Sequence, residues 1–433
     1  MTESGGCNRR EFIKAAGLAG VGAALGLPAG GVGAAEKYHV VVIGGGAGGA
    51  TAARYLRKYD PDRVRVTLVE PKKQYHTCFG GNWYLGGFAD MADLSHGYKA
   101  LDRGNGLRVV HDTAEEVDPE NRKVRLSGGS MLAYDRLVMA PGIDFRWEEV
   151  DGMGPADAEQ VPHAWKGGEQ YRILRRQLEA MDDGGTVAIC PPANPFRCPP
   201  GPYERVSLIA HYLKQNKPRS KVLVLDAKDS FSKQGLFQEG WRQLYGDRIE
   251  WVPGSEGGLV SRVEPQAGKV FTQEGFQEHT PDVLNFIPPQ RAAAIARRAD
   301  LADRTGWCPV NQKTFESERH PGIHVIGDAA IAGAMPKSGH SANNQGKMVA
   351  AAIVSLVQGT AVPEPSMANT CYSLIGPEYG ISVAAVYRHR GGKLVSVEGA
   401  GGVSPAEADA FFRMREARFT RGWYQAITQD IFG

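Results

Sequence analysis

One turn in the sequence combines residue types and spacing that favour thiol chemistry. Residues 191–204 read PPANPFRCPPGPYE, and they place Cys198 between an apolar strand pattern at 186–190 and a helical pattern at 205–215. Prolines stiffen such a loop, and a thiolate beside a helix N-terminus is stabilised by the helix macrodipole. Glu204 lies near the first turn of the same helix. We therefore predict a reactive thiol at Cys198, with a purely structural thiol as the alternative.

The other cysteines follow no pattern that their spacing alone explains. The chain contains six cysteines, of which Cys7 belongs to the N-terminal export segment described below. The remaining five form no Cys-x-x-Cys pair, no zinc spacing and no Cys-x-x-Cys-His haem attachment site, so we predict no metal ligands. An odd number in an oxidising compartment implies that at least one does something other than pair. The five are Cys78, Cys190, Cys198, Cys308 and Cys371.

A dinucleotide site is predicted near the start of the chain. The apolar strand pattern at 37–43 leads into a glycine-rich turn, then a helical pattern at 50–59 and a second strand that ends at Glu70. Glycines in such a turn allow the pyrophosphate to approach the helix N-terminus, and the acid at the end of the second strand binds ribose hydroxyls. A carboxylate there disfavours a 2′-phosphate, which leaves FAD or NAD. The predicted cofactor contacts of this turn are Gly44, Gly46, Ala47, Gly49 and Glu70.

Two later segments decide between FAD and NAD. Residues 137–142 (LVMAPG) and 323–329 (IHVIGDA) resemble motifs of flavoproteins with two dinucleotide-binding domains, which implies FAD in the first site. The contacts implied are Ala140, Gly142, Gly327 and Asp328. In relatives that use NADH, a glycine-rich turn follows the strand at 186–190, whereas this chain has the proline-rich turn. Proline has no N–H to offer a pyrophosphate, so we predict no NAD(P)H binding.

These elements predict an α/β fold with two Rossmann-like dinucleotide-binding domains, similar to glutathione reductase, and a C-terminal α+β domain. The length of 433 residues is ample for such an arrangement. The first domain is split by the insertion of the second. The predicted boundaries are 1–35 for a signal peptide, 36–150 and 295–365 for the two parts of the FAD-binding domain, 151–294 for a second domain without an NAD site, and 366–433 for the C-terminal domain.

The N-terminus predicts export. Residues 8–14 (NRREFIK) form a twin-arginine motif, and a Gly/Ala-rich run with small residues near 33–35 follows. A membrane anchor is the alternative, but the run is too rich in glycine to favour lipid. We therefore expect a folded protein in the periplasm. The net charge of +2 gives no indication of nucleic-acid binding.

Several segments together resemble the flavoprotein subunit of flavocytochrome c sulfide dehydrogenase, a relative of the sulfide:quinone oxidoreductases. They are YHTCFGGN around Cys78, the proline-rich turn, VIGDAA, SGHSANNQGK and the terminal GWYQAITQDIFG. The resemblance implies oxidation of sulfide to sulfur or polysulfide, with electrons passed to a c-type cytochrome subunit in a heterodimer. It implies that the C-terminal domain, 366–433, lies near the flavin and the cytochrome interface. It also implies that Cys78 is bonded to the flavin 8α-methyl group, that Cys198 and Cys371 form a redox-active disulfide, and that Glu204 accepts a proton. Since this chain has no haem attachment site, the haem would be carried only by the partner.

Alternatives remain open at this stage. The Cys198–Cys371 pair could be a structural disulfide worth roughly 5 kcal/mol, the electron acceptor could be a membrane quinone, and the FAD could be a purely structural group. The C-terminal segment has apolar residues at helical spacing, which predicts a helix. We expect this helix to pack in the core or beside the flavin, with Trp423 near the flavin ring. Binding of the helix to a membrane is the less favoured hypothesis. We interpret Lys337 and His340 as packing or solvent-facing residues, Cys190 as the end of a buried strand, and Cys308 as part of a turn.

Overall fold

The computed structural model describes residues 37–104 and 106–433. The first domain is built on a five-stranded parallel sheet in the order β20-β9-β1-β2-β5. Its strands are β20 (Ile323–Val325), β9 (Arg136–Met139), β1 (Tyr38–Ile43), β2 (Val64–Val69) and β5 (Arg108–Val110). The two apolar strand patterns at the start of the chain are therefore adjacent strands. Because β20 comes from the later segment, the predicted split of this domain between two parts of the chain is visible in the sheet.

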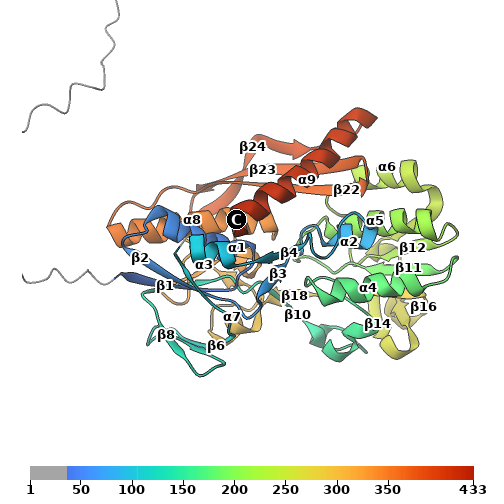
Figure 1. The fold of residues 1–433 in the computed structure, drawn as a ribbon. Coiled ribbons are helices and arrows are strands. Elements are labelled where there is room, and N and C mark those ends of the chain that lie inside the picture. Colours follow the sequence, from blue (N-terminus) through green and yellow to red (C-terminus); the bar gives the residue numbers. More distant parts are fainter. Residues whose placement is uncertain (1–36, 105) are drawn as a thin grey trace, which may run out of the picture. The chain divides into compact units, whose positions relative to one another are not determined.

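Two helices pack against each other beside this sheet, as Figure 1 shows. Helix α1 (Ala47–Tyr59) begins three residues before the pattern at 50–59 and presents small residues to its neighbour. Helix α8 (Gly339–Gln358) begins at Gly339, where the Ser338 side chain accepts a hydrogen bond from the Ser341 N–H and caps the helix. The start of α8 consequently lies inside the segment SGHSANNQGK.

The second domain has a four-stranded parallel sheet in the order β13-β12-β11-β17. These strands are β13 (Ile249–Val252), β12 (Lys221–Leu225), β11 (Thr186–Cys190) and β17 (Val283–Phe286), and the main helices are α4 (Glu169–Ala180), α5 (Gly201–Asn216) and α6 (Gln234–Tyr245). The proline-rich turn joins β11 to α5, as its flanking patterns predicted. Cys190 ends β11 and is buried, as expected.

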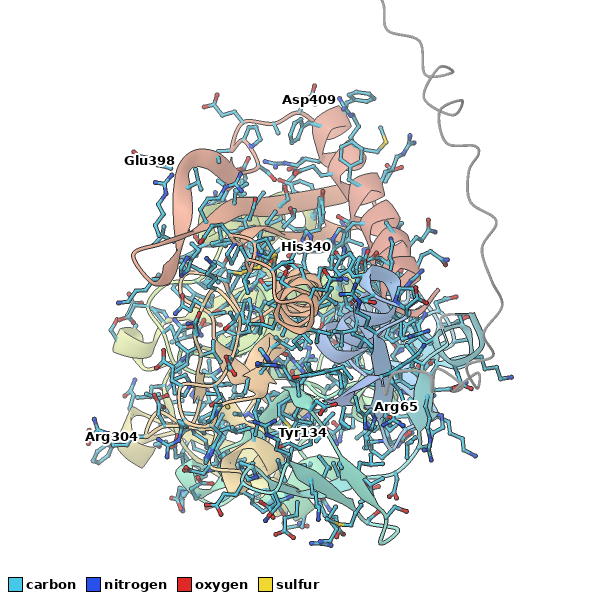
Figure 2. The ribbon with its side chains drawn as sticks, turned by 90° about the vertical axis from the view of Figure 1, so that its left-hand side faces the viewer. Arg65, Tyr134, Arg304, His340, Glu398 and Asp409 are labelled. Carbon is cyan, nitrogen blue, oxygen red and sulfur yellow. The ribbon has the colours of Figure 1, made fainter. Side chains whose placement is uncertain are left out.

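The C-terminal part has an antiparallel sheet of three long strands, β22 (Ser366–Gly376), β23 (Tyr379–Arg390) and β24 (Lys393–Val403). Helix α9 (Ala410–Phe432) runs along these strands (Figure 1). Figure 2 shows the same sheet lying over α8, with His340, near the start of α8, between the helix and the sheet. Because β22 contacts both α8 and α5, the C-terminal part brings its residues to the junction of the two Rossmann-like domains.

Smaller elements complete the fold. Antiparallel pairs and three-stranded sheets are formed by β3 (Gln74–His76) with β4 (Ser95–Gly97), by β10 (Ile143–Phe145) with β18 (Gln290–Ala292), by β6–β8 (Ala114–Asp118, Lys123–Leu126, Met131–Ala133) and by β14–β16 (Val260–Glu264, Lys269–Thr272, Gln277–His279). A parallel bridge joins β19 (Cys308–Pro309) to β21 (Ala330–Ile331), and the short helices are α2 (Gly81–Gly86), α3 (Lys99–Gly104) and α7 (Ala294–Arg298). Within the described ranges, no helix is both long and apolar enough to cross a membrane.

Candidate active site

A cavity of about 370 Å³ lies at the carboxyl edge of the first sheet, where a dinucleotide binds in this architecture. Nearly all of the cofactor contacts predicted from the sequence line it. They are Gly44, Gly46, Ala47, Glu70, Cys78, Ala140, Gly142, Gly327 and Asp328. Of the remaining two, Gly49 packs behind the turn and Trp423 lines a neighbouring cavity. The structure thus brings three separate parts of the sequence to one cavity.

The glycine-rich turn is shaped by backbone contacts that leave no room for side chains. Gly44 has φ of +98°, and a Cβ atom there would collide with the carbonyl oxygen of Ala140. A Cβ atom at Gly49 would collide with the carbonyl oxygen of Gly44, so α1 approaches β1 closely. Glu70 is fixed by two backbone N–H groups, accepting from Gly45 at 2.8 Å and from Lys72 at 2.9 Å. This arrangement is the cradle that a pyrophosphate and a ribose require.

Asp328 supplies an independent test of whether FAD fits this cavity. Its Oδ1 atom is buried and has no hydrogen-bond partner within the described residues, while its Oδ2 lies 3.6 Å from a guanidinium nitrogen of Arg197. A buried carboxylate oxygen without a partner requires an explanation, and a hydroxyl of a bound ligand would satisfy it. The ribityl chain of FAD carries such hydroxyls, so the residues present fit this cofactor.

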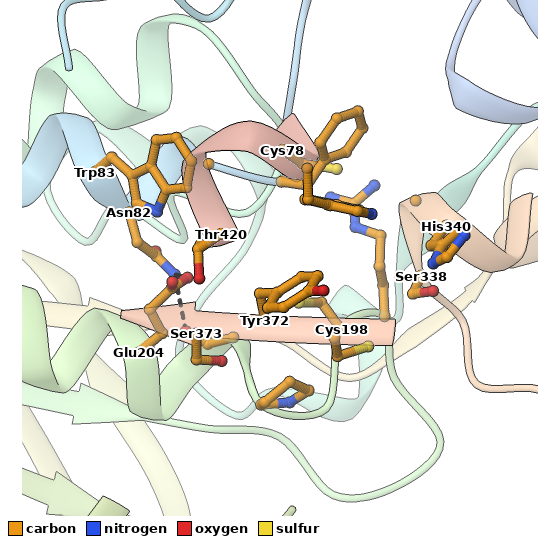
Figure 3. Close-up of a pocket in the computed structure, with 18 of the residues that line it drawn as sticks. Cys78, Asn82, Trp83, Cys198, Glu204, Ser338, His340, Tyr372, Ser373 and Thr420 are labelled. Carbon is orange, nitrogen blue, oxygen red and sulfur yellow. Dashed lines mark hydrogen bonds between the residues drawn. The ribbon is translucent and has the colours of Figure 1, made fainter. Parts of the chain in front are cut away.

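A second, smaller cavity of about 70 Å³ contains the predicted reactive groups (Figure 3). Cys78, Cys198, Cys371, Glu204 and Trp423 all line it, and Cys78 lines the dinucleotide cavity as well. The five cysteines of the described chain are free thiols. The predicted Cys198–Cys371 disulfide and the flavin bond at Cys78 therefore remain predictions, whereas the convergence of the three sulfur-bearing residues is a finding.

Cys198 occupies a strained position at the junction of the proline-rich turn and α5. Its φ is +58°, a region that non-glycine residues rarely adopt, and its N–H donates to the carbonyl of Lys337 at 2.7 Å. The Gly201 N–H donates to the carbonyl of Cys198 at 2.8 Å. A Cβ atom at Gly201 would lie 2.9 Å from the Cys198 sulfur and 2.8 Å from the Trp165 ring. A glycine at the start of α5 is thus what leaves space for the thiol.

The expectation of a stabilised thiolate at Cys198 is wrong for this structure. Burial raises the pKa of Cys198 well above its usual value, and neighbouring Cys371 and Glu204 raise it further. The helix start is in place, but a macrodipole contributes only about 0.3–1 kcal/mol at most exposed sites, less than the desolvation of a buried charge. Cys198 consequently favours the neutral thiol, or a sulfur that is bonded to another atom.

Cys371 has different surroundings on β22. The Asn369 side-chain Nδ2 donates to the Cys371 sulfur, with 3.2 Å between nitrogen and sulfur. The Oδ1 atom of Asn369 accepts from the Ser338 hydroxyl at 2.6 Å and from the Ser341 hydroxyl at 3.2 Å, which turns the amide N–H₂ toward the sulfur. The N-terminal cap of α8 thereby orients a donor at Cys371.

Glu204 lines the same small cavity as Cys198 and Cys371, and it is 8% exposed. Its carboxylate accepts from the Asn82 side chain and from the Leu374 N–H, each at 2.9 Å. Burial raises the pKa of Glu204, and these hydrogen bonds oppose the shift only in part. A carboxyl group with a raised pKa is suited to exchange protons near neutral pH.

The structure adds residues that the sequence analysis missed. Asn82, Trp83 and Arg197 line the cavity, and the Nε1 atom of Trp83 is buried without a partner within the described residues. Lys233 reaches the backbone of β22 from the start of α6. Arg197 could have been noticed beside Cys198, but nothing in the local sequence of Lys233 or Asn82 distinguishes them.

The structure agrees with some predicted environments and corrects others. His340 lines the small cavity, accepts a hydrogen bond from the Thr370 N–H at 2.9 Å and packs edge-on against the Trp423 ring at 6.1 Å between centroids, which agrees with the predicted packing role. The Lys337 ammonium is held by two backbone carbonyls. Cys308 lies on the short strand β19 rather than in a turn, because its segment pairs with β21. On α9, Ile427 and Ile431 are buried but Phe419 is exposed, so the apolar stripe leaves the core toward the start of the helix.

Side chains fill the place where the second domain would hold the ribose of a nicotinamide cofactor. Asp226 follows β12, the position of the ribose-binding acid in such a unit, and it is fully buried. Its carboxylate is engaged by Lys228 at 2.6 Å, by the Tyr203 hydroxyl at 2.6 Å and by Trp251 Nε1 at 3.0 Å. The Asp226 carboxylate is thus occupied by side chains, and the absence of an NAD site stays a prediction.

The fold and the two cavities define an oxidoreductase with two Rossmann-like domains, in which thiols face a dinucleotide site. Comparison with known protein families agrees. Residues 171–288 match the sulfide dehydrogenase [flavocytochrome c] flavoprotein chain, central model, residues 363–432 match flavocytochrome c sulphide dehydrogenase, flavin-binding, and residues 38–182 match pyridine nucleotide-disulphide oxidoreductase.

Individual proteins give the same result. The sulfide-quinone reductase of Aquifex aeolicus is 32% identical over 80% of this chain and 83% of its own. The sulfide dehydrogenase [flavocytochrome c] flavoprotein chain of Chlorobaculum thiosulfatiphilum is 64% identical over 9% of this chain and 79% of its own. A solved structure of the sulfide:quinone oxidoreductase from Aquifex aeolicus superposes with a TM-score of 0.70 at 18% identity, covering 91% of this chain and 92% of the other. The chain spans just under two thirds of two mitochondrial sulfide:quinone oxidoreductases.

The chain belongs to the family that comprises the flavoprotein chain of flavocytochrome c sulfide dehydrogenase and the sulfide:quinone oxidoreductases. The predicted fold class and the predicted family are both confirmed. The protein is accordingly a flavoprotein oxidoreductase with an FAD-binding domain.

Proposed function

We propose that this protein oxidises sulfide to sulfur or polysulfide through a Cys198–Cys371 disulfide, and that it passes the electrons to a c-type cytochrome subunit in the periplasm. One observation carries the proposal: Cys198 and Cys371, from different parts of the chain, line one small cavity that shares Cys78 with the dinucleotide cavity. The twin-arginine motif that supports the periplasmic location lies outside the described residues.

FAD would be held by the glycine-rich turn at Gly44, by Glu70 at the adenosine ribose and by Asp328 at the ribityl chain. Cys78 is the residue that we expect to be bonded to it, because it lines both cavities. When bound, FAD accepts two electrons together and releases them singly, which is the chemistry needed between sulfide and a haem.

The volume of the cavity favours a small substrate such as the hydrosulfide anion. A volume of about 70 Å³ holds a few water-sized groups, since one water needs about 10–15 Å³ by the same measure. Hydrosulfide fits this space, and the N–H of Trp83, which lies close enough to the Glu204 carboxyl to lower its pKa, would place a donor beside the bound anion. Glu204 lies in the same cavity and is placed to take the proton that H₂S loses.

The chemistry balances as thiol–disulfide exchange. Hydrosulfide attacks one sulfur of the disulfide and forms a persulfide, while the other sulfur leaves as a thiolate. A second hydrosulfide takes the outer sulfur of the persulfide as HSS⁻ and leaves a thiol. The thiol and the thiolate then return to the disulfide with the loss of one proton and two electrons, for which bound FAD would be the acceptor. In total, two HS⁻ ions yield one HSS⁻ ion, one proton and two electrons.

Quinone is the second candidate acceptor, and a specific observation favours it. Phe411 and Phe419, on the exposed side of α9, are 62% and 52% exposed, and apolar helix faces of this kind are used at membrane surfaces. Against quinone, the family model matched at the C-terminus is that of the flavocytochrome c enzyme. Any haem would be carried by a separate polypeptide, because this sequence has no Cys-x-x-Cys-His.

The test is an anaerobic titration of the purified holoprotein with sulfide, followed by addition of an acceptor. We expect the flavin absorbance to bleach with sulfide and to return with cytochrome c in the absence of detergent. Recovery with a soluble quinone analogue but not with cytochrome c would replace the cytochrome by quinone. A flavin that sulfide does not bleach would make FAD a structural group and end the proposal.

A further inference from the structure

Lys233 is a buried cation at the edge of the active site. It is 9% exposed and is the only lysine among the buried side chains of the described residues. Its ammonium donates to the carbonyl oxygen of Cys371 at 2.9 Å and to the Ser373 hydroxyl at 2.9 Å. Among the residues that the structure describes, no carboxylate oxygen lies within 4.0 Å of it. A buried ammonium without a carboxylate is costly unless another negative charge faces it.

The backbone of Lys233 is also unusual. Its φ is +62° at the N-cap of α6, a conformation that a non-glycine residue rarely adopts. Strained backbone of this kind persists where the surrounding structure requires it, and it concentrates at functional sites. The conformation starts α6 while the side chain reaches β22.

Beyond its two hydrogen bonds, the Lys233 ammonium is influenced at longer range by two sulfurs and a carboxyl of the cavity and by Glu416 outside it. Cys371 has the largest electrostatic effect on it, followed by Glu204, Cys198 and Glu416. Burial lowers the pKa of Lys233 to about 8, so the ammonium is still mostly charged at pH 7. The cation is therefore available at neutral pH to a negative charge that forms on Cys371.

The two sulfurs of the pair differ in how well they can hold that charge. Cys371 receives the N–H of Asn369 at its sulfur and has the Lys233 ammonium on its own carbonyl. Within the described ranges, no hydrogen bond reaches the sulfur of Cys198. Its neighbours include the Glu204 carboxyl, which disfavours a thiolate, and the Arg197 guanidinium, whose opposing effect is smaller. Hydrogen bonds and positive charge favour a thiolate, whereas burial beside a carboxylate disfavours it.

We propose that Lys233 is a positioning residue that holds negative charge on Cys371, so that Cys371 is the leaving sulfur and the persulfide forms on Cys198. This inference rests on the proposed function. In the step concerned, HS⁻ forms a bond to the Cys198 sulfur, the Cys198–Cys371 bond breaks, and its electron pair stays on Cys371 as the thiolate. Charge is conserved, and no further oxidant or reductant takes part. A leaving thiolate that is stabilised leaves faster.

The first experiment locates the persulfide. Oxidised holoprotein is mixed with one equivalent of sodium sulfide, quenched with iodoacetamide and digested, and the peptides of Cys198 and Cys371 are weighed by mass spectrometry. We expect the extra sulfur on the Cys198 peptide and simple alkylation on the Cys371 peptide. An extra sulfur on Cys371 would overturn the assignment while leaving the proposed function intact. An extra sulfur on neither peptide would overturn both.

The second experiment tests Lys233 without sulfide. The holoprotein is reduced with dithiothreitol, and the rate of iodoacetamide labelling at Cys371 is followed between pH 6 and 9. In Lys233→Met we expect labelling about tenfold slower at pH 7, because the thiolate is the form that reacts and a nearby cation favours it. Lys233→Arg keeps the charge and should stay within about threefold of the wild type.

A matched control separates this effect from general loss of a lysine. Lys214 is an exposed lysine on α5 that donates only to the Leu244 carbonyl, so Lys214→Met should label like the wild type. Equal labelling rates in Lys233→Met and Lys214→Met would overturn the role of Lys233. If Lys233→Met does not fold, Lys233→Arg with wild-type labelling and Lys233→Gln with slow labelling would decide the same question.

Discussion

Asn82 on α2 and Glu204 on α5 are joined by a hydrogen bond of 2.9 Å between the amide Nδ2 and the carboxylate Oε2. The other end of the Asn82 amide accepts from Arg205 Nε at 3.1 Å. Helix α2 begins three residues after Cys78, and α5 begins three residues after Cys198. This hydrogen bond therefore connects the segment after Cys78, the expected site of the flavin bond, to the segment after Cys198. It also fixes Glu204, the predicted proton acceptor.

Replacing Glu204 by Gln should slow the reduction of the flavin by sulfide about 100-fold, the usual contribution of a proton-transfer group. Because burial raises the pKa of Glu204, the wild-type rate should fall on the acid side of a midpoint above 4.5, where the carboxyl is protonated and cannot accept. Stopped-flow absorbance between pH 5 and 8 measures this limb. An acid limb that persists unchanged in Glu204→Gln would assign the titration to another group.

The same variant gives a stability prediction with a defined sign. A carboxyl whose pKa is raised in the folded protein binds its proton more tightly there, so it contributes stability at low pH that is lost as the pH rises through the folded value. The melting temperature of the wild type relative to Glu204→Gln should therefore fall between pH 5 and pH 8. A difference that is constant with pH would show that Glu204 titrates normally.

Replacing Cys371 by Ser should slow flavin reduction by sulfide about 10³-fold or more, because a hydroxyl can neither form nor leave a disulfide under these conditions. Bound FAD and its reduction by dithionite should be unchanged, since Cys371 does not line the dinucleotide cavity. If the pair were a structural disulfide, the variant would instead melt at a lower temperature and keep its rate. Absorbance spectra and thermal melts distinguish the two outcomes.

Replacing Gly201 by Ala tests whether the exact place of the Cys198 sulfur matters. The new methyl would lie 2.9 Å from that sulfur and 2.8 Å from the Trp165 ring, so one of them must move. We expect at least a tenfold slower reaction with sulfide at unchanged FAD content. Gly235 is the matched control near the start of α6, where a Cβ meets nothing within 4 Å. Equal rates in the two variants would contradict the steric argument.

Replacing Cys78 by Ala should convert covalent FAD into dissociable FAD. After precipitation with acid, the yellow colour should stay with the wild-type pellet and pass into the supernatant of the variant. Cys308→Ala is the control, because Cys308 is buried on β19 away from both cavities. Release of FAD from the wild type would show that the cofactor is held only by the contacts of the dinucleotide cavity.

The dinucleotide site and part of the thiol site could be predicted from the sequence, because the contacts that form them lie within short segments of the chain. A strand, a glycine turn and a helix follow one another at Gly44, and the backbone geometry that binds a dinucleotide is set within that segment. Cys198 and Glu204 likewise share one turn and one helix start. The position of Cys371 near Cys198 and Glu204 could be predicted only from the family resemblance, because no spacing in the sequence predicts that β22 contacts α5.

The protonation state of Cys198 was decided only by the tertiary structure. Local sequence put a helix N-terminus beside Cys198 and so predicted a thiolate, but desolvation and the Glu204 carboxylate outweigh a macrodipole in a buried site. Lys233 and Asn369 come from α6 and β22, and they meet at Cys371 through packing between elements far apart in the chain. Electrostatic energies depend on burial and on distances of a few ångströms, which a linear pattern of residues does not specify.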